Sequence, residues 1–258
     1  MSTHYETLQH ADTYREAFAV EPPAALGERH LWPRKPGFFI VHAATATALV
    51  QGPASTVGAV EEAAPTTASD TPSDAASTRV LVPAQWGLVP HWVKSASDAK
   101  LRAPKLVNAK SDLAATSTAF RDAWLNGQRC IVPMVAFYED DLRSGKAVPT
   151  RVARVDGKPM GVAGLWARWQ GEGAESGEVI ISYCLLTVNA NNHALLHRYG
   201  QPGSEKSMPA ILNEGAYDAW LTARPDKAKE FMRQYAAEKL TANPVEKKAD
   251  KVPKGWLG

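Results

Sequence analysis

The stretch Trp86-Gly-Leu-Val-Pro-His-Trp92 decides the fold of this chain. Two further blocks follow it closely, Leu106-Val-Asn-Ala-Lys110 and Arg129-Cys-Ile-Val-Pro133, and the second of these leads into Phe137-Tyr138-Glu139. Their valine, isoleucine and aromatic residues are typical of buried strands. The first block therefore predicts a strand that ends in a rigid aromatic turn, and the third predicts two strands in succession.

The run between the second and third blocks predicts one helix, because residues from Leu113 to Trp124 recur at helical spacing. The Asn126-Gly127 pair that follows is typical of a left-handed helix end. Further helices are expected at 10–19 and from Pro225 onward. Strands outnumber helices without regular βαβ alternation, so the pattern favours an α+β fold. The strands are expected at 38–42, 47–50, 79–83, 86–89, 130–133, 136–138, 160–163 and 179–188.

The length of 258 residues and the 45% hydrophobic content indicate one domain over residues 1–258 with a substantial core. Residues 52–77 interrupt it with alanine, threonine, serine, proline and acidic residues and no aromatic residue. Such a segment buries too little apolar surface to offset its ordering entropy, so we expect a flexible insertion. We also expect a loosely ordered basic tail at 243–258.

Composition also limits the compartment and the partners. The chain has no run of 18 apolar residues and no signal peptide, so we expect a cytoplasmic protein that does not cross a membrane. Its two cysteines, Cys130 and Cys184, lie in apolar strand-like runs and are expected to be reduced core thiols.

The net charge is only +2, so the overall charge does not indicate a nucleic-acid partner. Between Lys94 and Arg129, however, seven basic residues stand against three aspartates, and such a stripe could bind phosphates. A solvated charged surface is an equally good interpretation of the same residues.

The ordered blocks, together with Gly164-Leu-Trp166 and Met208-Pro-Ala-Ile-Leu212, resemble the SOS-response-associated peptidase (SRAP) family over most of the chain. The resemblance implies an α+β fold with a bifurcated sheet or barrel-like core flanked by helices. It also implies a sensor of abasic sites in single-stranded DNA. In that family the N-terminal cysteine supplies an amine that forms an imine with the ring-opened sugar, and its thiol closes a thiazolidine.

Position 2 of this chain is serine, not cysteine. Removal of Met1 would expose a serine amine, and an α-amine titrates close enough to neutral pH to attack an aldehyde. The hydroxyl is a much weaker nucleophile than a thiol. The resemblance therefore implies that Ser2 can form an imine and promote β-elimination without a lasting cross-link.

The resemblance assigns two further catalytic residues. Asn108 would orient the reacting N-terminus, although an asparagine before a helix start is also a common helix cap. Glu139 would act as general acid or base beside the amine, although Asp140 and Asp141 after it also suit a solvent-facing hairpin.

His197 is the candidate for the family's histidine, although the insertion 198–207 separates it from Met208-Pro209. His193 and His197 have the spacing of two zinc ligands, but no glutamate follows His193 and no third ligand is nearby, so no metal or other cofactor is expected. Residues expected to contact DNA are His4, Trp92, Lys105 and Lys110. Lysine at 110 keeps the attraction for phosphate but lacks the fork of the arginine usual in the family.

Three functions remain open at this point. The first is sensing of abasic sites in single-stranded DNA through residue 2, and the second is non-covalent binding of single-stranded DNA after loss of the cross-linking thiol. The third, implied by the family name, is autoproteolysis at the N-terminus. A monomer with single-stranded DNA as its partner is expected in each of the first two cases.

Overall fold

Five strands pair in a closed ring at the centre of the molecule, in the order β10, β4, β3, β6, β9 and back to β10. Their bounds are β3 (Pro36–His42), β4 (Arg79–Trp86), β6 (Arg129–Met134), β9 (Met160–Gln170) and β10 (Val179–Asn189). The computed structural model describes residues 3–51, 78–172 and 176–245. The ring confirms the predicted barrel-like core and the α+β class.

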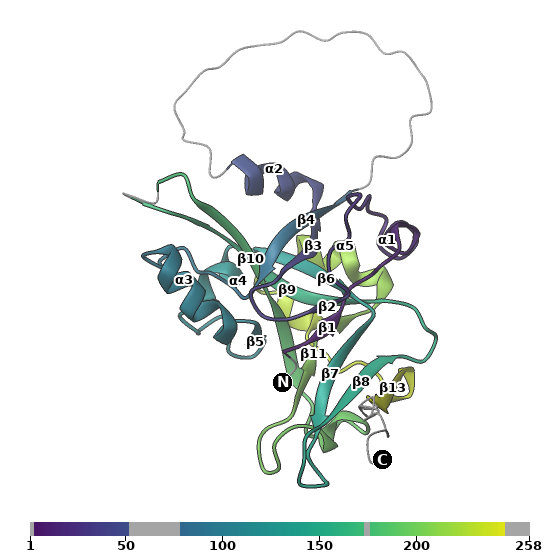
Figure 1. Ribbon diagram of the computed structural model, residues 1–258. Coiled ribbons are helices and arrows are strands. Elements are labelled where there is room, and N and C mark those ends of the chain that lie inside the picture. Colours follow the sequence, from purple (N-terminus) through teal and green to yellow (C-terminus); the bar gives the residue numbers. More distant parts are fainter. Residues whose placement is uncertain (1–2, 52–77, 173–175, 246–258) are drawn as a thin grey trace, which may run out of the picture.

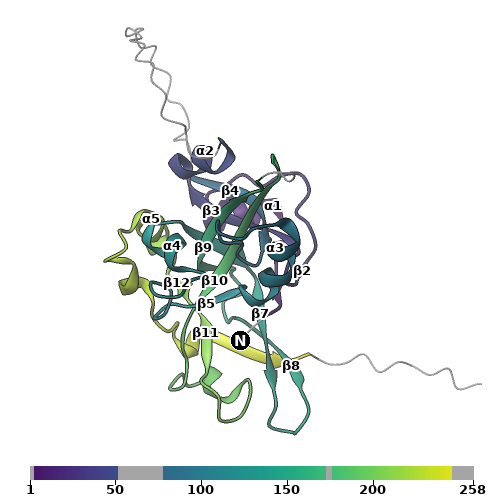
Figure 2. The ribbon, with the colours of Figure 1, turned by 90° about the vertical axis from the view of Figure 1, so that its left-hand side faces the viewer.

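The sheet splits along one edge of strand β10, which has two different neighbours there (Figures 1 and 2). Along one edge it pairs first with β4 and then with β5 (Asn108–Lys110), both parallel to it. Gly87 makes this exchange possible, because it ends β4 with φ +119° and its N–H donates to the Tyr183 carbonyl at 2.8 Å. A side chain at Gly87 would meet the carbonyl oxygen of Ala103 at 2.5 Å. The Trp86-Gly pair therefore sets the branch point that makes the sheet bifurcated.

The barrel interior is closely packed where β6, β9 and β10 adjoin. Cys130 and Cys184 are fully buried free thiols, as expected from their apolar runs. Gly164 lies between them, and a Cβ there would meet the Cys184 carbonyl oxygen at 2.6 Å and the Cys130 sulfur at 2.9 Å. Burial raises the pKa of Cys184 to about 12, so this thiol is not a nucleophile at neutral pH.

A second sheet of five strands extends from the barrel, in the order β13, β8, β7, β1, β2 (Figure 1). Strand β1, the first strand of the chain, lies next to the edge of this sheet, between the edge strand β2 and the central strand β7. The two sheets are joined where the Tyr5 hydroxyl of β1 hydrogen-bonds to the Tyr183 hydroxyl of β10 at 2.5 Å. The strand bounds are β1 (Tyr5–Glu6), β2 (His30–Leu31), β7 (Ala136–Asp141), β8 (Val148–Arg154) and β13 (Leu240–Pro244).

Short helices flank the barrel. The predicted helix at 10–19 is confirmed as α1, which buries Tyr14 and Phe18 and ends at Ala19 in the left-handed region. The α-helices are α1 (Ala11–Phe18), α2 (Ala43–Gln51), α3 (Ala96–Arg102), α4 (Arg121–Leu125) and α5 (Tyr217–Thr222). The 3-10 helices are η1 (Ala103–Lys105), η3 (Leu196–Arg198), η4 (Glu214–Ala216), η5 (Ala228–Phe231) and η6 (Ala237–Lys239). The last short strands are β11 (Ser207–Pro209) and β12 (Ile211–Leu212).

Several expected elements are wrong. The strand expected at 47–50 lies in helix α2, whose alanine-rich sequence favours a helix. The helix expected through 113–124 is helical only from Arg121, since the serine and threonine residues before it form turns. Gly127 nevertheless has the predicted left-handed conformation, with φ +68°.

The C-terminal part also differs from the prediction. Instead of a helix from Pro225, the chain forms the 3-10 helix η5 and then a segment without regular secondary structure. That segment lets the Tyr235 carbonyl bond the ring of buried His193 at 2.8 Å. Residues 243–244 are not loose, because they belong to β13 and pair with Arg151 and Thr150 of β8. The insertion 52–77 and residues 246–258 of the tail lie outside the described residues.

No helix in the described parts of the chain is long and apolar enough to cross a membrane.

Candidate functional site

A groove of about 340 Å³ opens beside the start of the chain, over the second sheet. Thr3 and Glu139 both line it, so the residue next to position 2 and the predicted acid or base share one cavity. Ser2 itself lies outside the described residues. The lining residues are Thr3, His4, Trp32, Tyr138, Glu139, Asp140, Leu142, Pro149, Gly200 and Gln201.

Strand pairing explains why distant segments meet here. Tyr5 of β1 is opposite Leu31 of β2 and Phe137 of β7, and both pairings are antiparallel. Continuing each register by one residue places His4 opposite both Trp32 and Tyr138, and the N–H of Tyr138 donates to the His4 carbonyl at 3.1 Å. Side chains opposite each other share one face of a sheet, so these three line the groove together.

Buried Glu6 lies next to these three side chains and accepts several hydrogen bonds. Its carboxylate accepts hydrogen bonds from the Arg151 guanidinium at 2.7 and 3.2 Å, from Arg29 at 3.3 Å, and a very short one from the Tyr138 hydroxyl. Burial alone would raise the pKa of Glu6, but these hydrogen bonds outweigh burial and lower the pKa to about 2. Glu6 is therefore an anion at neutral pH and fixes the Tyr138 ring.

His4 is neutral at physiological pH. Burial and the neighbouring His30 lower its pKa from 6.5 to about 4, although the Glu6 charge opposes this. Its Nε2 lies 3.0 Å from Nδ1 of His30, so the two imidazoles share a hydrogen bond. His4, which is expected to contact DNA, lines the groove, but a neutral ring offers no charge to a phosphate.

Glu139 lies on β7, opposite Thr150 of β8, and is 8% exposed. It lines both the groove and an adjoining cavity of about 110 Å³ that Gly200 and Gln201 also line. The alternative of a solvent-facing hairpin glutamate is therefore wrong, because the neighbouring Asp140 carries the exposed position.

Asn108 does not cap a helix. It is half-buried at the first position of β5, opposite Leu185 of β10. Two positions further, Lys110 forms an ion pair with Glu205 at 2.6 Å, and Glu205 also accepts from Asn189 at 3.2 Å. A phosphate at Lys110 would have to displace this carboxylate.

The histidines behave differently from the expectation. His197 is exposed, its Nδ1 lies 2.8 Å from the His193 carbonyl oxygen, and it is not among the residues that line the groove. The insertion after it reaches the groove instead, where the N–H of Gly200 donates to the Asp140 carbonyl at 2.8 Å. In the described parts of the chain, no three histidine, cysteine or acidic side chains gather as metal ligands would.

The other residues expected to contact DNA lie away from the groove lining. Trp92 is 36% exposed, donates its Nε1–H to the Thr118 carbonyl at 3.3 Å and has the Arg102 guanidinium over its ring at 5.2 Å. Lys105 is exposed on η1, beside α3. Among the groove residues that sequence reasoning missed is Trp32, which lies between Leu31 and Pro33 and carries no local signal of a site.

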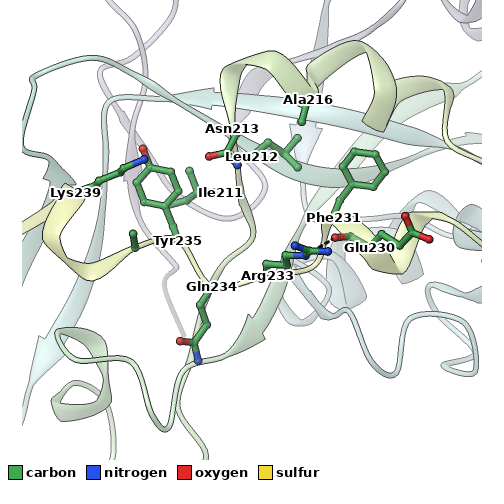
Figure 3. Close-up of a pocket in the computed structure, with 11 residues that line it drawn as sticks. Ile211, Leu212, Asn213, Ala216, Glu230, Phe231, Arg233, Gln234, Tyr235 and Lys239 are labelled. Carbon is green, nitrogen blue, oxygen red and sulfur yellow. Dashed lines mark hydrogen bonds between the residues drawn. The ribbon is translucent and has the colours of Figure 1, made fainter.

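A second cavity, of about 390 Å³, lies between β12, η4 and η5 (Figure 3). Figure 3 shows Phe231 and Leu212 at one end and the Arg233 side chain bonded to the Glu230 carbonyl, at 2.9 Å. None of the residues predicted to act in catalysis or DNA binding lines this cavity, so the groove is the candidate site.

Comparison with known proteins agrees with the resemblance. The family model described as SOS response associated peptidase (SRAP) matches residues 2–252. A protein named abasic site processing protein HMCES from Gallus gallus is 28% identical over 191 residues, which cover 66% of this chain and 53% of that protein. Abasic site processing protein YobE from Bacillus subtilis is 26% identical over 165 residues, covering 62% and 68%. The chain thus spans about half the length of the vertebrate relatives it matches.

Solved structures share the fold. A crystal structure from Bordetella bronchiseptica has a TM-score of 0.76 and 35% identity, covering 95% of this chain and 99% of that one. Another from Bacteroides thetaiotaomicron has a TM-score of 0.69 at 19% identity, covering 95% and 92%, and supports the fold alone.

Proposed function

The chain belongs to the SOS response associated peptidase family, and from this premise we propose that it binds abasic sites in single-stranded DNA at the groove beside Glu139. The observation that carries the proposal is that Thr3 and Glu139 line one groove. The α-amine of residue 2, one residue before Thr3, would then react within reach of the Glu139 carboxylate.

The chemistry needs an amine, an aldehyde and a proton carrier. The neutral α-amine of Ser2 adds to C1′ of the ring-opened sugar, and the resulting carbinolamine loses water to give an imine. After the addition, Glu139 takes a proton from the positively charged nitrogen of the adduct and gives it to the departing hydroxyl, which leaves as water. Asn108 is given its orienting role by the family resemblance, and it is not among the residues that line the groove. We assign no step to His197, because it is exposed outside the groove lining.

Lys110 and Lys105 are proposed phosphate contacts on the approach to the site. Lys105 is exposed, whereas Lys110 would exchange its ion pair with Glu205 for a phosphate. Both contacts are independent of base sequence, which suits a sensor that must accept any strand.

Borohydride trapping tests the proposal. We expect reduction to join this chain covalently to an abasic single strand and not to an intact strand, and unreduced mixtures to contain no heat-stable adduct. Ser2→Cys should give a heat-stable adduct without reductant, because the thiol traps the imine internally. An N-terminal extension that displaces the Ser2 amine is the control and should abolish trapping.

Failure of both this chain and Ser2→Cys to be trapped would overturn the covalent part of the proposal. Measured affinity for single strands would then decide whether the groove binds DNA without reacting. Equal affinity for duplex, abasic and intact strands would rule out damage sensing.

A further inference from the structure

Three aromatic rings form a continuous stack along the edge of the groove. The His4 ring lies between Trp32, at 4.0 Å between centroids and 11° between planes, and Tyr138, at 4.0 Å and 7°. Near-parallel rings at this separation are in full stacking contact. The stack follows from the antiparallel register, which places His4 directly opposite both of the other residues.

The Tyr138 and His4 rings are both held by hydrogen bonds. Tyr138 is fixed through its hydroxyl by Glu6, and His4 is fixed by the 3.0 Å contact with His30. The turn at Trp32 is also constrained, because the N–H of Lys35 donates to the Trp32 carbonyl at 3.1 Å and Arg34 has φ +68°. A side chain larger than glycine adopts that conformation only under the constraint of its surroundings. The stack is therefore rigid before any ligand arrives.

One end of the stack is open. Trp32 has one face on His4, yet 49% of the residue is exposed, so its other face is turned to solvent. Trp92, the other exposed tryptophan among the described residues, differs because the Arg102 guanidinium lies over its ring. An exposed indole on a rigid support costs little conformational entropy when a second ring stacks on it.

We propose that the open face of Trp32 is a stacking platform for one nucleobase of the bound strand, next to the position of the abasic sugar. This inference rests on the proposed function and deepens it, since it names the residue that would hold the strand beside the reacting site. A base fits better than a phosphate, because the stack is neutral and offers π surface rather than charge. Larger purine rings should stack more strongly than pyrimidines.

Fluorescence anisotropy with two labelled strands of equal length tests the platform. One strand is oligo-deoxyadenylate, and the other carries tetrahydrofuran spacers in place of every base, so it has the phosphates without the rings. We expect Trp32→Ala to weaken binding of the first strand by about 5- to 150-fold, the range for one stacked base, and binding of the second by less than about twofold. Trp32→Phe should retain part of the affinity, and Val155→Ala, at an exposed apolar residue outside the groove lining, is the control.

The outcomes separate the two proposals. If the native chain binds neither strand, the proposed function fails and the platform with it. If the native chain binds and Trp32→Ala weakens both strands equally or neither, the function stands and the platform is wrong. Thermal unfolding of each variant shows whether it is folded, and a loss of stability without a base-dependent loss of affinity would mean that the stack is only structural.

Discussion

Two charged side chains lie buried in different regions of this molecule, and they are accommodated in opposite ways. Glu6, under the groove, is 2% exposed and accepts hydrogen bonds from Arg151, Arg29 and Tyr138. Arg129, on the barrel strand β6, is 3% exposed, and within the described residues its Nε and Nη2 have no hydrogen-bond partner.

Arg129 is surrounded mainly by aromatic rings. Its guanidinium lies 5.9 Å from the Trp124 ring centroid and 5.5 Å from that of Trp220, and burial lowers its pKa. Cation–π contacts of this kind offset only part of the desolvation of a charge. Arg129 thus packs between helices α4 and α5 and the barrel.

The difference shows which buried charge arranges other groups. Glu6 fixes Tyr138 and thereby one end of the ring stack that lines the groove, whereas Arg129 contacts two indoles that the barrel core holds in any case. A paired charge that orients exposed groups suits a binding site, and a charge sandwiched between core rings suits a structural role.

Replacing Glu6 should have the largest effect on stability. Glu6→Gln removes the buried anion from the half-buried Arg151 and Tyr138, so we expect the free energy of unfolding to fall by about 3 kcal/mol. Urea unfolding at pH 7 measures it. Asp12→Asn, which breaks an exposed pair with Arg15, is the control and should cost less than about 0.5 kcal/mol. Equal losses of stability for the two variants would show that the buried Glu6 network contributes no more than an exposed ion pair.

Replacing Arg129 should have a smaller effect. Arg129→Met keeps much of the volume and removes an incompletely hydrogen-bonded charge, so we expect a change within about 1 kcal/mol in either direction. Arg151→Met is the matched variant at the groove and should lose clearly more, because it leaves Glu6 buried with fewer donors. A loss above about 3 kcal/mol for Arg129→Met in the same urea assay would show that this charge, too, is essential to the fold.

These two regions also mark how far the sequence could predict the structure. The barrel strands at 38–42, 130–133 and 179–188 were predictable, because apolar runs specify burial locally. The alignment of His4, Trp32 and Tyr138 along the groove was not predictable, because it depends on the register of three strands from distant parts of the chain. Glu139 was named through its motif and lines the groove, whereas Trp32 has no local pattern. His197 was expected at the site because the resemblance supplies a histidine there, and the sequence did not show that Gly200 and Gln201 of the insertion line the groove instead.

The neutral state of His4 predicts a moderate pH effect. Its pKa is about 4 in the folded chain and 6.5 in the reference state, so the unfolded chain binds the proton first as pH falls. Stability contributed by neutral His4 is complete above pH 6.5 and is lost between pH 6.5 and 4, by about 1 kcal/mol after solvent screening. Comparing unfolding of the native chain and His4→Phe at pH 7 and pH 5 isolates this residue. An identical pH dependence in both would show that His4 is protonated in the stack.

The smallest effect is expected at the half-exposed pair of Lys110 and Glu205. Glu205→Gln frees Lys110 for a phosphate, so affinity for single-stranded DNA should rise by about two- to fivefold, within the range of a surface ion pair. The slope of log affinity against log salt should steepen by about 0.7. Lys110→Gln should remove the gain in the double variant. A fall in affinity for Glu205→Gln would instead give Glu205 a direct part in binding.

The rate of borohydride trapping on abasic single-stranded DNA, measured for Glu139→Gln beside Arg129→Met, tests the central claim most directly. The claim is that the groove holding Glu139 is where residue 2 reacts. We expect Glu139→Gln to slow trapping by about 10²- to 10⁴-fold, as loss of a general acid or base does, while Arg129→Met leaves the rate unchanged. Peptide mapping should place the trapped sugar on residue 2. Unchanged trapping by Glu139→Gln, or an adduct on a lysine elsewhere, would contradict the assignment.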